Sequence, residues 1–155
     1  MNGSTEPMSE AHSRYPVAIR WTSGKEGVAS SVDGLPELPV ASPPSFGGPA
    51  GVWSPEHLFV LSAAACWMTT FRAIAEASSF DAVAVEADAE GFLEKGVDRR
   101  YSIPRLTLRP VVTVRREADR DKAMRLIEKA EQACLIARSM RAAVTLEGRV
   151  EVREA

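Results

Sequence analysis

One segment constrains the fold more than any other: residues 58–68 are apolar on almost every side when drawn as a helix. Ser54, Pro55 and Glu56 precede it, and they supply a hydroxyl N-cap, a proline at the first helical position and an acid near the positive end of the helix dipole. The pattern predicts a helix from Pro55 to about Ser78. A helix that is apolar all round must be covered on every side, and one small sheet would hardly cover it, which favours a subunit interface.

Length and charge narrow the class of protein. The chain has 155 residues and a net charge of −2 without a long run of one sign, which predicts no nucleic-acid partner and no anionic membrane surface. Residues 1–14 are polar and are expected to form a disordered tail, and residues 15–155 a single domain. The longest mainly apolar stretch, 58–71, is shorter than a bilayer span, and the start of the chain lacks a secretory signal. We therefore expect a cytoplasmic protein without a membrane segment.

The remaining periodicities predict an α+β fold with antiparallel sheet. Pro104 and Pro110 are expected to make one of the long strands an edge or bulged strand, since proline cannot donate to the ladder. The first predicted elements are a hairpin of 15–21 and 27–32, a loop over 35–55 with a short strand around 38–40, and the apolar helix. Two long strands follow over 83–90 and 106–115, and then a helix that is capped by Asp119 or Asp121 and carries Cys134 on its apolar stripe. The last predicted element is a strand over 144–152.

The two cysteines allow two interpretations. Cys66 lies in the middle of the most apolar helix, and free cysteine is among the most buried residue types. Burial without a nearby cation raises a thiol pKa, which favours an inert core residue. However, Cys66 and Cys134 both lie on stripes that face one core, and a disulfide needs Cα atoms only about 4.4–6.8 Å apart. A redox pair and a pair of inert core thiols both remain open.

No other chemistry-bearing pattern competes with the thiols. His12 and His57 have no partner at metal-ligand spacing, and two cysteines do not make a four-ligand zinc set. The chain carries no glycine-rich phosphate loop, dinucleotide fingerprint or serine elbow. The sequence therefore predicts no metal and no cofactor.

The residues around Cys66 resemble a known family. Ser54-Pro-Glu-His-Leu-Phe followed by Ala64-Ala-Cys66 is similar to the Asn-Pro-Glu-x-Leu…Ala-Ala-Cys signature of the OsmC/Ohr family of thiol peroxidases. The second cysteine stands at the expected later position, and the order of elements matches from Tyr15 onward. The resemblance implies antiparallel sheets wrapped around a long buried central helix, in an intertwined homodimer with its active sites at the subunit interface.

The resemblance also implies a reaction. By this resemblance we expect Cys66 to be the peroxidatic cysteine, which reduces an organic hydroperoxide and becomes a sulfenic acid, and Cys134 to be the resolving cysteine, which forms a Cys66–Cys134 disulfide with it. Glu56 is the acid that orients a cationic partner. A dithiol of the dihydrolipoyl type recharges the enzyme.

Two departures from the family pattern leave an alternative open. Where Ohr-type members have Gly-Gly-Arg-x-Gly, this chain has Ser23-Gly-Lys25-Glu-Gly27; Lys25 is the candidate cation, with Arg20 as the nearest substitute, and lysine lacks the planar fork of arginine. The family's Cys-Pro-x-Ser is Cys134-Leu-Ile-Ala here, which is more typical of a divergent OsmC-like branch. The alternatives are a non-catalytic OsmC-like protein that binds an apolar small ligand at the dimer interface, and a dimeric domain whose cysteines only fill the core.

Helix geometry limits what Glu56 can do. Ten residues separate it from Cys66, and ten residues of straight helix rise about 15 Å. Glu56 therefore cannot touch the Cys66 sulfur of the same straight helix. Its role requires a cation, a break in the helix or a neighbouring subunit.

Overall fold

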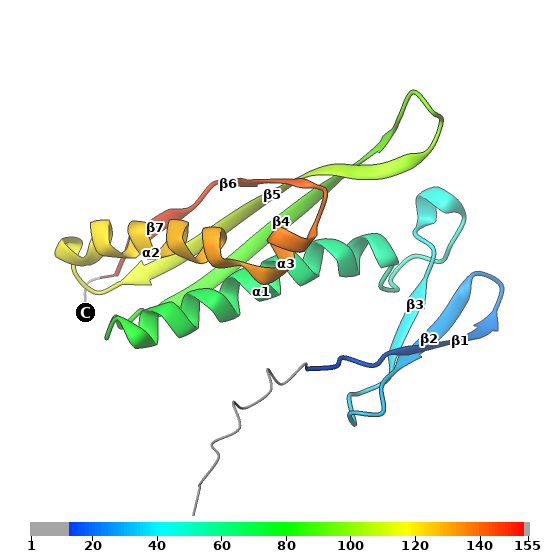
Figure 1. The fold of residues 1–155 in the computed structure, drawn as a ribbon, viewed down its shortest axis with the longest axis horizontal. Coiled ribbons are helices and arrows are strands. Elements are labelled where there is room, and N and C mark those ends of the chain that lie inside the picture. Colours follow the sequence, from blue (N-terminus) through cyan, green and yellow to red (C-terminus); the bar gives the residue numbers. More distant parts are fainter. Residues whose placement is uncertain (1–12, 154–155) are drawn as a thin grey trace, which may run out of the picture. The chain divides into compact units, whose positions relative to one another are not determined.

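The computed structural model describes residues 13–153 (Figure 1). The chain divides after Pro55 into two compact units, and each is described by itself. Of the predicted tail, residues 1–12 lie outside the described residues, and residues 13 and 14 belong to no helix or strand.

The first unit is a three-stranded antiparallel sheet in the order β1-β2-β3. Its strands are β1 (Ala18–Ser23), β2 (Glu26–Ser30) and β3 (Leu38–Ala41), followed by the 3-10 turn η1 (Pro44–Phe46). Gly24 closes the β1–β2 turn with a φ of 50°, a conformation that favours glycine. The predicted hairpin and the short strand after it are confirmed.

The second unit holds the helices and a four-stranded sheet. It contains α1 (Pro55–Ala77), β4 (Ala84–Lys95), β5 (Tyr101–Val114), η2 (Glu117–Asp119), α2 (Arg120–Ala133), α3 (Leu135–Ser139), β6 (Ala143–Leu146) and β7 (Arg149–Val152). Helix α1 begins at Pro55 and ends one residue before Ser78, as the sequence predicts. The α+β class is confirmed.

Strand β5 is central in this sheet, so the expectation of an edge strand is wrong. It pairs antiparallel with β4 on one side and parallel with β6 and β7 on the other. The Leu108 carbonyl accepts a 2.8 Å bond from the Glu147 amide, so even-numbered β5 residues direct their polar groups toward β6 and β7. Pro110 therefore faces the gap between those two strands, where no amide is needed. The register also shifts between Phe92 and Glu94, opposite Pro104, so the expected bulge is present.

The predicted last strand is two strands, and both run parallel to β5. The direction follows from the connection: α2 carries the chain back along the sheet before β6 starts, and a helical crossover of this kind joins parallel strands. The break falls at Gly148, where an added Cβ would lie 2.6 Å from Ile127 Cγ2 of α2. Gly148 thus lets α2 approach the sheet.

Helices α1 and α2 share one hydrophobic core with the sheet. Trp67 and Phe71 of α1 stack with ring centroids 5.3 Å apart, and Trp67 Nε1 donates to the Ile127 carbonyl of α2 at 3.3 Å. Gly91 of β4 leaves room for Val60 of α1, since an added Cβ would lie 2.6 Å from Val60 Cγ2. These contacts fix α1 and α2 side by side.

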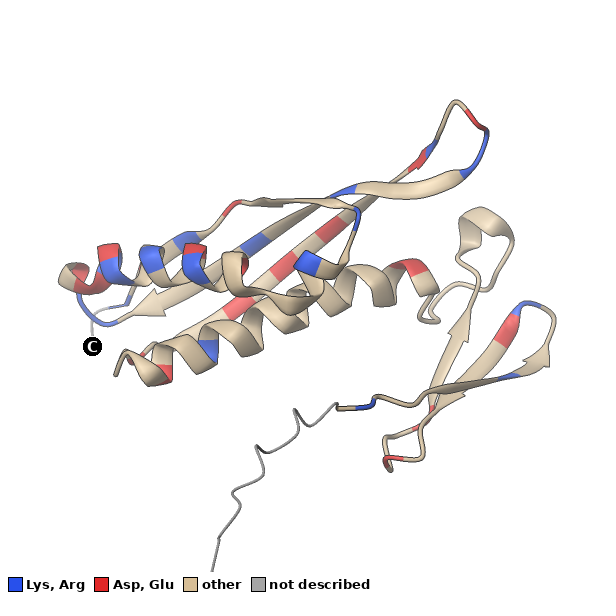
Figure 2. Cartoon of the chain, in the orientation of Figure 1, with Lys and Arg blue, Asp and Glu red and all other residues tan. Residues whose placement is uncertain are grey.

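Within its unit α1 buries one face, and apolar side chains stay partly exposed on the opposite face. Leu61 and Met68 remain 44% and 38% exposed. Figure 2 shows the contrast with α2, whose surface alternates basic and acidic residues while α1 is mostly uncharged. Helix α1 is long and apolar enough to cross a membrane, although the shorter stretch 58–71 did not predict this. Core helices of soluble proteins often have the same length and composition.

Candidate functional site

The structure places the two cysteines on different kinds of backbone. Cys66 lies in the middle of α1 and is half-buried, whereas Cys134 is 1% exposed. The sequence predicted Cys134 on the apolar stripe of the second helix, and this prediction is wrong, because α2 ends at Ala133. Cys134 has extended φ and ψ of −65° and 109° and stands between α2 and α3, ending one helix and preceding the other. The chain turns at Cys134 so that α3 starts beside α1.

The two thiols influence each other directly. Both cysteines are free, and each one shifts the pKa of the other: a hydrogen bond from the Cys134 side chain lowers that of Cys66, and Cys66 raises that of Cys134. Residues that are far apart in the chain are therefore in direct contact within the second unit.

Cys66 is the more acidic thiol of the two. Burial raises its pKa, but main-chain N–H groups of Ile136 and Leu135 and the side chains of Cys134 and Thr70 donate hydrogen bonds that outweigh burial, so its pKa lies below the ordinary value. The groups that lower it are hydrogen-bond donors, and among residues 13–153 no cation contributes to this shift. The ionised form of Cys66 is therefore favoured by oriented dipoles.

Cys134 is shifted in the opposite direction. Burial raises its pKa, and the negative charge of a Cys66 thiolate raises it further, while main-chain N–H groups of Ala137 and Ile136 only partly offset this. The Cys134 thiol therefore keeps its proton when Cys66 has lost its own. The pKa values of the two thiols are therefore shifted in opposite directions, and Cys66 ionises first as the pH rises.

Thr70 is a contact that the sequence interpretation missed. Its Oγ1 lies 3.9 Å from Cys66 Sγ, one helical turn along α1. The signal was present in the sequence, because residues four apart on a helix are neighbours. The main-chain donors of Leu135 and Ile136 carried no such signal, since they depend on where the chain turns.

Glu56 lies in the first turn of α1, and the helix runs unbroken from there past Cys66. The rise of about 15 Å between the two positions therefore separates them. Glu56 Oε2 is buried and has no hydrogen-bond partner among the described residues. A buried carboxyl oxygen is costly without a hydrogen-bond donor, so this position favours a donor that the described contacts do not supply.

Lys25 and Arg20 belong to the first unit, whereas Cys66 belongs to the second. The Lys25 ammonium donates to the Phe46 carbonyl at the end of η1. Within the described part of the chain its charge faces no carboxylate at ion-pair distance. The predicted contact between a cation and the Cys66 sulfur remains a prediction.

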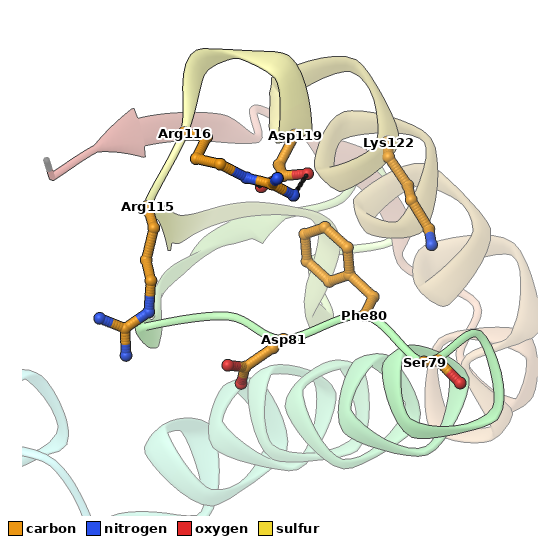
Figure 3. A pocket seen from close by; sticks show the side chains of 7 residues that line it. All are labelled: Ser79, Phe80, Asp81, Arg115, Arg116, Asp119 and Lys122. Carbon is orange, nitrogen blue, oxygen red and sulfur yellow. Dashed lines mark hydrogen bonds and ion pairs between the residues drawn. The ribbon is translucent and has the colours of Figure 1, made fainter.

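The second unit also has an open pocket of about 520 Å³ beyond the C-terminus of α1 (Figure 3). Two interactions at its wall are resolved: Arg116 pairs with Asp119 at 3.0 Å, and Lys122 donates to the Ser78 carbonyl. Ser79, at its edge, follows the end of α1 at Ala77, which lies eleven residues and about 16 Å of helix beyond Cys66. The pocket is therefore separate from the thiols.

Comparison with known sequences places these residues in one family. The sequence model of the OsmC-like proteins matches residues 48–148, a range that contains Glu56, Cys66 and Cys134 but not Lys25. A curated relative, the uncharacterized protein YmaD of Bacillus subtilis (strain 168), is 24% identical over 151 residues, which are 94% of this chain and 97% of the relative.

Solved structures share the fold. An OsmC-like protein of unknown function from Vibrio cholerae, VCA0330, superposes with a TM-score of 0.77 at 19% identity, over 88% of this chain and 99% of its own. An organic hydroperoxide resistance protein OsmC from Legionella pneumophila gives 0.71 at 25% identity, over 90% and 99%. The organic hydroperoxide resistance protein OhrB of Bacillus subtilis gives 0.64 at 24%, over 88% and 96%.

Proposed function

The chain belongs to the OsmC-like protein family, and on that premise we propose that it is a cysteine-based peroxidase that reduces organic hydroperoxides. The observation that carries the proposal is the hydrogen-bonded pair of Cys66 and Cys134, with the pKa of the first lowered and that of the second raised. Relatives that share the fold include organic hydroperoxide resistance proteins. We infer that this chain has the same class of substrate.

The first step is a two-electron oxidation of sulfur. The Cys66 thiolate attacks the distal oxygen of the hydroperoxide, an S–O bond forms as the O–O bond breaks, and the alkoxide takes a proton to leave as an alcohol. The donors around Cys66 favour this step, because the thiolate and not the thiol is the nucleophile. The peroxide is reduced and Cys66 becomes a sulfenic acid.

The second and third steps return the enzyme to its starting state. The Cys134 sulfur attacks the Cys66 sulfenic acid, a disulfide forms, and the hydroxyl leaves with the Cys134 proton as water. A dithiol of the lipoyl type then reopens the disulfide by exchange and is itself oxidised to a cyclic disulfide. This cycle fits a reducing cytoplasm, where structural disulfides are rare.

Glu56 and Lys25 have supporting roles in the proposal. Lys25 supplies a positive charge toward the peroxide, with Arg20 as the alternative, and Glu56 orients that charge. The buried, unpartnered Glu56 Oε2 supports this assignment, because it needs a donor. Activity should fall in Glu56→Gln and Lys25→Met and persist in Arg20→Met; the reverse order for Lys25 and Arg20 identifies Arg20 as the cation.

We propose that the working form is a homodimer. Apolar side chains stay exposed on both units: Leu61 and Met68 on α1, and Ile19 and Trp21 on β1. Exposed apolar surface of this kind marks an interface, and a second copy is the partner that the family resemblance implies. Sedimentation equilibrium tests this, and a monomer at micromolar concentration contradicts it.

The test of the activity is consumption of cumene hydroperoxide by the reduced protein. We expect one equivalent of peroxide to be consumed per chain without a dithiol, and continued turnover with dihydrolipoamide. The Cys66→Ser variant should consume none. Equal consumption by wild type and Cys66→Ser contradicts the proposal.

A pocket in the first unit favours the second candidate, a non-catalytic protein that binds an apolar ligand. The pocket holds about 470 Å³, and Ile19, Trp21 and Val40 contribute to its lining. Mainly apolar walls with a few polar groups are typical of small-ligand sites. Calorimetry with dodecanoate, with Trp21→Ala as control, separates this function from peroxide reduction: binding by a protein that consumes no cumene hydroperoxide supports the second candidate.

A further inference from the structure

Two neighbouring threonines on α1 use their hydroxyls differently. Thr69 is exposed and donates to the main-chain carbonyls of Ala65 and Cys66, at 3.2 and 3.1 Å. Thr70 is half-buried, and its Oγ1 contacts Cys66 Sγ at 3.9 Å. Among the described residues the sulfur is its hydrogen-bond partner. The same residue type thus supports the helix at one position and faces the thiol at the next.

The state of the sulfur decides the direction of this bond. In a thiol–hydroxyl pair either group can donate. A thiolate has no proton and can only accept, so the hydroxyl must then be the donor. Hydrogen bonds to an ionised partner are roughly twice as strong as neutral ones. The contact therefore stabilises the ionised sulfur more than the neutral one.

We propose that the Thr70 hydroxyl is a hydrogen-bond donor to the Cys66 thiolate and, with the amides of Leu135 and Ile136, keeps this sulfur reactive without a cation from its own unit. Cys134 is the titratable group that contacts Cys66 within residues 13–153, and it donates as a thiol. The role concerns the thiolate itself. Its benefit for peroxide reduction rests on the proposed function.

The experiment measures thiolate formation in the full chain, without peroxide. The rate of alkylation of Cys66 by iodoacetamide is followed by mass spectrometry from pH 5 to 10 for wild type, Thr70→Val, Thr70→Ser and Thr69→Val. Valine keeps the branched shape and removes the donor, whereas serine keeps the donor. Thermal unfolding of each variant checks that it is folded.

We expect Thr70→Val to move the midpoint of the profile to higher pH and to slow alkylation at pH 7 about fivefold, in line with the loss of one hydrogen bond to a charged group near the surface. Thr70→Ser should restore the wild-type profile, and Thr69→Val should leave it unchanged. An unchanged profile in Thr70→Val overturns the inference, as does an equal shift in Thr69→Val or a failure of serine to rescue.

The result is independent of the peroxidase test. A shifted profile in a protein that consumes no cumene hydroperoxide retains the role of Thr70 and rejects the proposed function. Peroxide consumption that needs Cys66, together with an unshifted Thr70→Val profile, retains the function and rejects the role of Thr70.

Discussion

Cys66 and Cys134 are the same side chain in the same unit, in contact with each other, and they differ in almost everything else. Cys66 is on a regular helix and half-buried, with several donors directed at its sulfur. Cys134 is at the junction of two helices and fully buried, next to a sulfur that is ready to carry a negative charge. Burial raises the pKa of both thiols; only at Cys66 do the donors outweigh it.

The difference shows that the apolar surroundings of a cysteine do not decide its reactivity. The apolar sequence around Cys66 favoured an inert residue, and that argument holds only while no donor reaches the sulfur. The donors come from Cys134, from the main chain of α3 and from the next turn of α1. The order of reactivity between the two thiols follows from the number of donors to each one and from the charge of its neighbour.

The largest expected effect is on overoxidation. In Cys134→Ser the Cys66 sulfenic acid has no thiol to condense with, so excess cumene hydroperoxide should drive it to sulfinic acid roughly a hundredfold faster than in wild type. Mass spectrometry of the intact chain counts the oxygens added. Cys66→Ser is the matched control and should gain none. If both variants take up oxygen equally, the two thiols have no distinct roles.

The next effect is on selectivity of alkylation. Since the pKa of Cys66 is lowered and that of Cys134 is raised, iodoacetamide at pH 7 should modify Cys66 at least about tenfold faster. Peptide mass spectrometry after a short pulse measures the ratio. In urea the ratio should approach one, because unfolding removes both environments. A ratio near one in the native protein, or faster modification of Cys134, contradicts the opposite pKa shifts of the two thiols.

A smaller effect is on stability, and it runs in the opposite order. Cys134→Ala removes a fully buried sulfur and should lower the free energy of unfolding by about 1 kcal/mol, as for other small deletions in a core. Cys66→Ala removes a half-buried one and should cost less, about 0.5 kcal/mol. Urea unfolding of the reduced proteins measures both. A larger loss at Cys66 contradicts the burial that the structure assigns to the two.

Local sequence signals predicted most of the fold. The start of α1 follows from Ser54, Pro55 and Glu56, and the first hairpin follows from a glycine turn between two alternating runs; both depend on neighbours in sequence. The central strand of the second sheet was harder to predict from the sequence. Pro110 argued against a central strand, and only the gap at Gly148, far along the chain, explains why it is tolerated there.

The residues of the candidate site also fall into those that the sequence predicted and those that only the fold reveals. Cys66, Glu56 and Cys134 were selected from their resemblance to the OsmC/Ohr motif, whereas the end of α2 at Ala133 carries no proline or glycine to mark it. The amides of Leu135 and Ile136 acquire their role only from that turn. Thr70 was one helical turn from Cys66 and could have been found.

The smallest expected effect is the dependence of stability on pH, and its sign differs between the thiols. The pKa of Cys66 is lower in the folded chain than in the unfolded chain, where it is about 8.5. Its contribution to stability is therefore present above the unfolded pKa and is lost as pH falls through the folded pKa. The pKa of Cys134 is raised, so its contribution is present below the unfolded pKa and is lost as pH rises through the folded pKa.

Single-cysteine variants separate the two signs. Relative to a protein with serine at both positions, Cys134→Ser, which keeps Cys66 and leaves a hydroxyl donor beside it, should gain stability between pH 7 and pH 9. Cys66→Ser, which keeps Cys134, should lose stability above about pH 8.5, because burial still opposes ionisation there. Urea unfolding at the two pH values measures both differences. If the two variants change in the same direction, the opposite pKa shifts are wrong, and with them the assignment of Cys66 as the thiolate.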